Sequence, residues 1–155
     1  MNFRVSGLAP DPFHHLYGLT DAQLRDHGVV RVIADRPLAF PDRIELRDGQ
    51  PGEALLLVNY MHQPASNPYR ASHAIFVLEG ALRSYNRSGE IPLVLRARQL
   101  SLRSFDADDM MLDAELVHGS AAEQSIGRLL ADCRASYIQA HYATRGCYAA
   151  RIERA

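Results

Sequence analysis

The chain has 155 residues, 47% of them hydrophobic and 23% charged, which is the size and composition of one ordinary globular domain. All 17 basic residues are arginine, so Schiff-base chemistry, a pyridoxal phosphate anchor and a P-loop lysine are excluded. The formal net charge is −1 and the arginines are spread along the chain, which argues against binding to duplex nucleic acid.

The sequence also indicates where the protein resides. No apolar stretch approaches the ~20 residues of a membrane-spanning helix, so we expect no membrane association. The first residues lack the apolar core and cleavage site of a signal peptide. Two cysteines in a chain of this size do not make a disulfide framework. We therefore expect a cytoplasmic protein that folds as a single domain over residues 1–155.

The first third of the chain predicts one helix among short strands. Thr20 and Gln23 have the spacing of a capping box that begins a helix over residues 20–27, and Gly28 ends it. Alternating or β-branched runs predict the strands. Strands are expected at residues 29–34 and 43–47, and a short strand or an extended arm at residues 2–8.

The centre of the chain predicts two buried strands. Residues 54–61 and 73–78 are continuously apolar, which is typical of strands covered on both faces. Pro64 and Pro68 exclude a helix from the polar segment between them. A proline at residue 92 favours the first turn of a short helix over residues 92–98.

The last third predicts four strands and one helix. Ser120 and Glu123 have the spacing of a second capping box, which would open the helix. Its inner face is expected to carry Ile126, Leu129, Leu130 and Cys133. The strands are expected at residues 100–105, 110–117, 137–140 and 148–152. Since helices and strands do not alternate regularly, we predict an α+β domain, a mainly antiparallel sheet with two or three short helices.

Two polar segments, residues 60–73 and 141–148, contain loops that follow predicted strands. Such loops commonly carry binding and catalytic residues, because the strands hold them in place while their side chains stay accessible. We expect both loops to converge on one pocket for a small anionic molecule. The candidate site residues are His62, Tyr69, Arg70, His73, His141, Arg145 and Cys147.

The residue types suggest a role for each member of this site. Arg70 and Arg145 can hold a phosphate or carboxylate through the planar donor fork of arginine. Histidine as a residue type can exchange protons near neutral pH, so His62 and His73 are the candidate catalytic pair for proton transfer. Tyr69, His141 and Cys147 complete the binding residues. The set suits an enzyme or a binding protein, and it identifies no cofactor.

Other functions fit the same residues. His62, His73, His141 and Cys147 are ligand types that zinc prefers, although their spacing matches no standard zinc motif. Alternatively, the loops contact another macromolecule or a second copy of this chain, as in a homo-oligomer. Cys147 is a nucleophile if a neighbouring histidine ionises it, or otherwise a small apolar filler.

Five segments together resemble a known family. They are residues 3–8, 60–64, 68–76, 102–108 and 145–151. On these segments the chain resembles, from end to end, a family of small bacterial proteins described as a domain of unknown function. The resemblance implies a bacterial, cytoplasmic, single-domain protein. It brings no activity, cofactor or catalytic residue with it.

Overall fold

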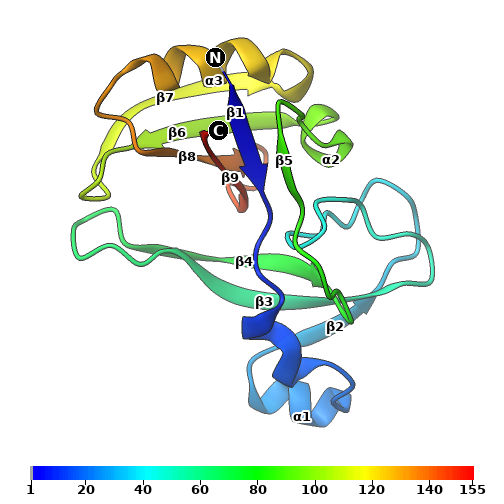
Figure 1. Ribbon diagram of the computed structural model, residues 1–155. Coiled ribbons are helices and arrows are strands. Elements are labelled where there is room, and N and C mark those ends of the chain that lie inside the picture. The colour runs from blue at the N-terminus through cyan, green and yellow to red at the C-terminus, as the bar shows by residue number, and fades with distance from the viewer. Residues whose placement is uncertain (1) are drawn as a thin grey trace.

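The computed structural model describes residues 2–155, which form two antiparallel sheets with helices packed against them (Figure 1). The strands are β1 (Phe3–Ser6), β2 (Val30–Ile33), β3 (Ala54–Gln63), β4 (Ala71–Leu78), β5 (Asn86–Ser88), β6 (Gln99–Phe105), β7 (Met111–His118), β8 (Tyr137–Tyr142) and β9 (Tyr148–Arg154). The α-helices are α1 (Asp21–Asp26), α2 (Leu93–Arg96) and α3 (Ala122–Ala131), and the 3₁₀ helices are η1 (Asp11–Leu16) and η2 (Gly119–Ala121). The predicted α+β class is confirmed.

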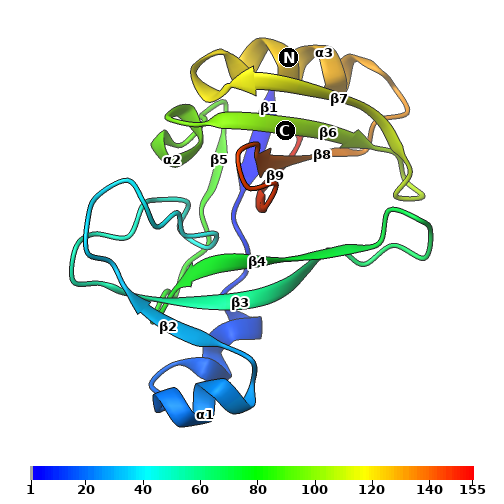
Figure 2. The same ribbon diagram turned by 180° about the vertical axis from the view of Figure 1, so that it is seen from behind.

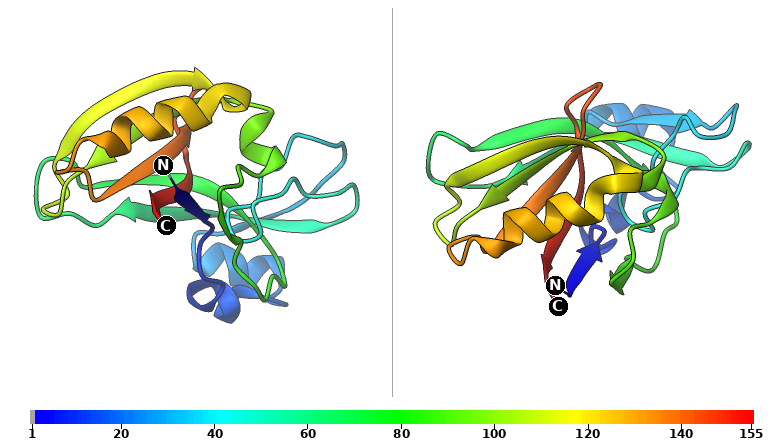
Figure 3. Two further views of the ribbon diagram at one scale, coloured as in Figure 1. Left: turned by 45° about the horizontal axis from the view of Figure 1, so that its top comes forward. Right: turned by 90° about the horizontal axis from the view of Figure 1, so that it is seen from above.

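The two sheets differ in size and lie against each other. The larger has the strand order β5-β1-β9-β8-β6-β7 and the smaller has the order β2-β3-β4. Helix α3 covers one face of the larger sheet, and the β3–β4 hairpin crosses the other face (Figures 2 and 3). Within residues 2–155, no helix has the length and apolar character needed to cross a membrane.

Strand β8 shows how the alternation of side chains builds these layers. Ile138 and Ala140 belong to the hydrophobic core that α3 completes with Ile126 and Leu130. The intervening residues face the smaller sheet, where the Gln139 side chain contacts His62 and the Tyr137 hydroxyl contacts Gln63 of β3. Because both faces are covered, every residue of β8 is buried.

A second core lies under the smaller sheet. It joins Leu56, Val58 and Ile75 of the sheet to Phe13 and Leu24 of the N-terminal helices. Tyr148 of β9 reaches into this cluster, and its ring lies 6.0 Å from that of Tyr60. The two sheets therefore share apolar contacts as well as polar ones.

The expected strand over residues 43–47 is absent, and Asp42 explains why. Its buried carboxylate accepts hydrogen bonds from the backbone N–H groups of Ile44, Glu45 and Leu78. Leu46 adopts φ 50°, which an extended strand does not allow. The segment is therefore an irregular loop clamped along the edge of β4 by a side chain.

The predicted caps have opposite outcomes. Gln23 N–H donates to Thr20 Oγ1 and Thr20 N–H donates to Gln23 Oε1, so the first capping box is confirmed. The second is wrong, because the N-cap of α3 is Ala121 and η2 precedes the helix. Helix α3 also ends at Ala131, which leaves Cys133 exposed instead of buried in the core.

The two expected loops are shorter than predicted. His62 lies within β3, and His141 lies within β8 with 0% of its surface exposed. The outer face of β3 is also partly open, with Met61 40% exposed, so the expected burial of both faces holds only near the start of that strand. Strand β5 was not expected, because its three side chains are all exposed and carry no apolar signal.

A bulge in β3 brings two polar residues toward the larger sheet. Tyr60 pairs with His73, whereas Gln63 pairs with Ala71, so β3 contains one extra residue between them. Such an insertion interrupts the strict alternation of side chains along a strand. His62 and Gln63 therefore both contact β8 although they are adjacent in sequence.

Gly119 offers a test of the packing between α2 and the turn before α3. A Cβ added there would lie 1.9 Å from the backbone oxygen of Leu95. We expect Gly119→Ala to lower the free energy of unfolding by about 3 kcal/mol, as overpacking against backbone does. The matched control is Gly127→Ala in α3, where nothing lies within 4 Å, and we expect a gain of about 0.5 to 1 kcal/mol. Urea denaturation of both variants measures the difference, and equal stabilities would contradict it.

Candidate functional site

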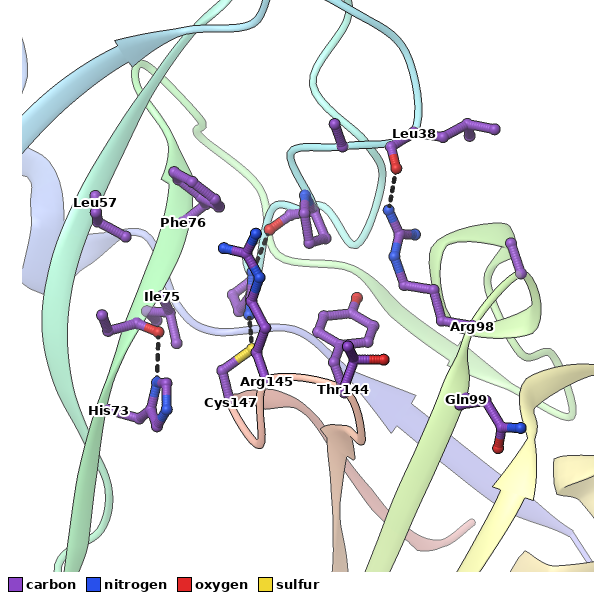
Figure 4. A pocket seen from close by; sticks show the side chains of 16 residues that line it. Leu38, Leu57, His73, Ile75, Phe76, Arg98, Gln99, Thr144, Arg145 and Cys147 are labelled. Carbon is purple, nitrogen blue, oxygen red and sulfur yellow. Dashed lines mark hydrogen bonds between the residues drawn. The ribbon is translucent and has the colours of Figure 1, made fainter.

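A cavity of about 530 Å³ opens between the two sheets at the edge of β4. Its walls are β4, the β8–β9 hairpin, the segment before Arg43 and the junction of α2 with β6 (Figure 4). Most of the wall is apolar, and Leu38, Leu57, Ile75 and Phe76 contribute to it. Both volume and lining are those of a small-molecule site.

Three predicted site residues line this cavity together. His73 comes from β4, while Arg145 and Cys147 come from the β8–β9 hairpin (Figure 4). His73 is more than 70 positions from the other two in the chain, and the packing of the two sheets brings it next to them. The end of the first polar segment and the second polar segment therefore both contribute to the lining of this cavity.

The β8–β9 hairpin presents the Arg145 guanidinium at the cavity. Gly146 adopts φ 76° and its N–H donates to the Tyr142 carbonyl, which closes the tight hairpin that presents Arg145. Arg145 is exposed, and within residues 2–155 its side chain makes no hydrogen bond or ion pair. Its five N–H donors are therefore available to an anion.

Arg43 forms the floor of the cavity and is 1% exposed. Its Nε donates to the Tyr148 carbonyl at 2.8 Å, and its terminal nitrogens donate to the Pro41 carbonyl and to Cys147 Sγ, the latter at 3.1 Å. It forms no ion pair with a carboxylate among residues 2–155. Of the three hydrogen-bond partners of Arg43 within residues 2–155, only the sulfur of Cys147 can carry a charge.

Arg98 closes the opposite side of the cavity and is neutralised. Its two terminal nitrogens lie 2.6 and 3.1 Å from the two carboxylate oxygens of Asp48. It also donates to the Leu38 carbonyl at 2.9 Å, which holds the rim of the cavity (Figure 4). Because Asp48 is 8% exposed, this pair is largely shielded from water.

Tyr142 lies between these two arginines. Its ring centre is 4.9 Å from the Arg43 guanidinium carbon and 5.4 Å from that of Arg98, within range of cation–π attraction. Burial raises the pKa of its phenol above the ordinary value. The hydroxyl is buried and has no hydrogen-bond partner within residues 2–155. A buried polar group without a partner is costly and is uncommon in native proteins.

His62 and His141 form a polar cluster beside the cavity. His62 Nδ1 lies 2.9 Å from Gln139 Oε1, and His141 Nε2 lies 3.1 Å from the same oxygen. The two imidazole rings are 4.9 Å apart, and His62 stacks on Tyr148. Neither histidine lines the cavity itself. Their contacts join β3 to β8 and β9.

Both of these imidazoles are shifted toward the neutral form. Burial, followed by the charge of Arg103, lowers the pKa of His141 to about 3. Burial also lowers the pKa of His62, although its hydrogen bond to Gln139 opposes this. A neutral imidazole has one N–H donor, so His141 donates to either Gln139 or Gly146 but not to both. His141 is consequently a poor proton donor at neutral pH.

Tyr69 and Arg70 lie away from the cavity at the tip of the β3–β4 hairpin. The Tyr69 ring packs 6.2 Å from Phe105, at the far end of β6 from Gln99, which lines the cavity. A strand of the length of β6 spans about 20 Å. Arg70 bonds to the nearby Ala65 carbonyl at 3.3 Å. The structure therefore does not bring these two residues together with His73 and Arg145.

The four residues considered for zinc do not gather at one point. His62 and His141 adjoin each other and share Gln139, whereas His73 and Cys147 line the cavity. Across the described part of the chain, no group of three or more His, Cys, Asp or Glu side chains is arranged to hold a metal ion.

The sequence did not indicate Arg43, Arg98 or Tyr142 as site residues. Arg43 was expected in a strand, and Arg98 at the end of a helix, where arginine is common. Their roles depend on long-range contacts with Cys147 and Asp48. The one available signal was the position of Arg98 directly after a mostly apolar segment, residues 91–97.

The fold and the cavity define an α+β protein with a cationic cleft between two antiparallel sheets. The chain belongs to the family described as "Protein of unknown function (DUF1203)", whose model matches residues 39–154. This matched region includes every residue named above as lining the cavity except Leu38. No curated protein and no solved structure matches the chain.

The low pKa of His141 predicts a pH-dependent stability. The unfolded chain takes up a proton on this side chain near pH 6.5, whereas the folded protein does so only near 3. Stability is therefore complete above pH 6.5 and is lost as the pH falls. Between pH 6.5 and about 4.5, where most carboxylates stay ionised, we expect a loss of roughly 2 to 3 kcal/mol.

Urea denaturation of His141→Asn and of the wild type across this pH range tests the origin of the loss. The variant should show a flatter dependence, whatever its stability at neutral pH. His14→Asn, at an exposed position, should retain the wild-type dependence. An unchanged slope in His141→Asn would show that His141 is not the source.

Proposed function

We propose that this protein binds a small anionic molecule with an apolar body in the cavity between the two sheets. The observation that carries the proposal is the Arg145 guanidinium, which has no partner among residues 2–155 and lies beside a largely apolar cavity. An arginine fork matches the oxygen geometry of a carboxylate or phosphate. The apolar wall around Ile75 and Phe76 would bury the rest of the ligand.

The other basic residues of the cavity, Arg98 and His73, have different roles in this proposal. Asp48 already neutralises Arg98, so Arg98 holds the rim at Leu38 and leaves the anion to Arg145. His73 stands on the β4 wall, and its Nδ1 lies 2.9 Å from the Ala74 carbonyl. If that nitrogen donates to the carbonyl, the second nitrogen of His73 remains for the ligand.

We assign proton exchange with the ligand to His73 in preference to His62. His73 lines the cavity, whereas His62 is stacked on Tyr148 and hydrogen-bonded to Gln139 beside it. If the protein is an enzyme, His73 is the residue that can act as a general acid or base on the bound molecule. His62 and His141 would then position the wall of the site. Tyr69 and Arg70 would act on a ligand only if it extended along β6.

We further infer that the protein acts in a bacterial cytoplasm. Its two cysteines, Cys133 and Cys147, are both free, as a reducing compartment would keep them. The family resemblance favours a bacterial source. Fractionation of native cells with an antibody against the protein tests the location, and recovery in a secreted or membrane fraction would contradict it.

Binding of benzoate, phenylacetate, octanoate and inorganic phosphate tests the proposed ligand class. We expect one or more of the apolar carboxylates to raise the melting temperature and to bind measurably by isothermal titration calorimetry. Arg145→Gln should weaken that binding about tenfold or more, since it removes a charge-assisted hydrogen bond.

The matched control is Arg83→Gln, which removes an exposed arginine outside the cavity lining. It should bind like the wild type. The neutral amides of the three carboxylates are measured in parallel. Binding that is equal for an amide and its carboxylate, or unaffected by Arg145→Gln, would refute an anion site at this position.

A further inference from the structure

We propose that Cys147 is the nucleophile of the cavity, ionised as a thiolate paired with Arg43, and that it forms a covalent bond with an anionic electrophile bound there. The anionic part of this statement rests on the proposed function. The reactivity of the thiol rests on separate contacts, those of Arg43.

The first argument is the charge balance around Arg43. A buried guanidinium is costly unless an opposite charge accompanies it. Arg43 is 1% exposed, and its described hydrogen-bond partners are the Tyr148 and Pro41 carbonyls and Cys147 Sγ. The carbonyls stay neutral, so the sulfur is the one of the three that can supply a negative charge.

The second argument is the geometry of the contact. The Arg43 nitrogen lies 3.1 Å from the sulfur, and it is a donor without any acceptor capacity. A donated N–H bond from a cation favours the thiolate over the thiol, as at known reactive cysteines beside arginine or lysine. In Figure 4 this contact is the dashed line that ends at the sulfur of Cys147.

The third argument is access, together with a sign that the cavity receives a ligand. Cys147 lines the cavity although it is 7% exposed overall. Tyr142, 6% exposed, lines the same cavity and carries a buried hydroxyl that has no partner in the described part of the chain. A ligand carrying a hydrogen-bonding group at that point would satisfy it. Cys133, by contrast, is exposed on the surface and lies outside the cavity, so it serves as an internal reference.

The chemistry can be written with iodoacetate as the anionic electrophile. The Cys147 thiolate attacks the methylene carbon, a carbon–sulfur bond forms, and iodide leaves with the electron pair of the carbon–iodine bond. No proton is transferred, because the nucleophile is already ionised. Arg145 would hold the carboxylate of the reagent while Arg43 holds the sulfur.

The test measures alkylation of the folded protein near pH 7 by intact mass spectrometry. Cys133→Ser reports on Cys147 alone, and Cys147→Ser reports on Cys133 alone. An ordinary thiol is only a few per cent ionised at this pH, so we expect Cys147 to react about tenfold faster than Cys133 with iodoacetate. Cys147 should also prefer iodoacetate over the neutral iodoacetamide, whereas Cys133 should not.

The outcomes separate this inference from the proposed function. Fast reaction of Cys147 with both reagents, without preference for the anion, would support the thiolate and argue against the anion site. If Cys147 in Arg145→Gln loses its preference for iodoacetate but still reacts with iodoacetamide, both the thiolate and the anion site are supported. Slow or absent alkylation of Cys147 by both reagents, while Cys133 reacts, would overturn the inference.

Arg43→Met tests the pairing directly. It should reduce the iodoacetamide rate of Cys147 to that of an ordinary thiol, provided that circular dichroism shows a folded protein. If the variant fails to fold, the comparison of Cys147 with Cys133 in the otherwise native chain still decides the matter. An Arg43→Met protein that is folded and reacts at the wild-type rate would refute the role of Arg43.

Discussion

The buried guanidinium of Arg43 is the interaction on which the cavity and the junction of the two sheets depend. It connects the Pro41 segment, which runs along β4, to the Tyr148 and Cys147 region at the start of β9. It also lies under the Tyr142 ring, which Arg98 approaches as well. One residue of an irregular loop thus contacts both sheets, because its backbone N–H donates to the Phe76 carbonyl of β4 and its side chain donates to the Tyr148 carbonyl of β9. The shape of the cavity and the placement of the C-terminal hairpin are therefore coupled.

This dependence also explains the division between the cavity and the histidine cluster beside it. Around Arg43 the contacts are cationic and, among residues 2–155, include no carboxylate, whereas around Gln139 they join neutral side chains of the two sheets to one another. Tyr148 belongs to both regions, since its carbonyl receives Arg43 and its ring stacks on His62. The histidines are therefore part of the wall that holds the hairpin, and the groups open to a ligand lie on the Arg145 side.

Local patterns in the sequence were enough to predict much of the fold. The Thr20 capping box and the apolar runs of β3 and β4 can be recognised from a few consecutive residues, because each feature is defined by residues that are close in the sequence. The failures have a common cause. Asp42 takes backbone donors that a strand would use, among them the N–H of Leu78, which is 36 positions away. The turn η2, which stands where a cap was expected, is likewise held by a bond from the Gly119 N–H to the distant Arg98 carbonyl.

The candidate site was predictable to a similar extent. His73, Arg145 and Cys147 stood out because polar residues follow strands there, and the structure brings them to one cavity. Tyr69 and Arg70 looked equivalent in sequence, but the length of the β3–β4 hairpin carries them to its tip. The cavity depends equally on Arg43 and Arg98, whose partners Cys147 and Asp48 lie 104 and 50 positions away. Contacts between residues so far apart produce no periodic pattern in the sequence from which they could be predicted.

The loop around Asp42 has one more consequence, for the solubility of the folded chain. Strand β4 is an edge of the smaller sheet, and an open edge can recruit strands from other molecules and start aggregation. Here Asp42 accepts the Leu78 N–H, the Arg43 N–H donates to the Phe76 carbonyl, and His73 lies against the Ala74 carbonyl. The residues that shape the cavity therefore also shield this edge. A substitution that enlarged the cavity at these residues would also expose β4 to strands of neighbouring molecules.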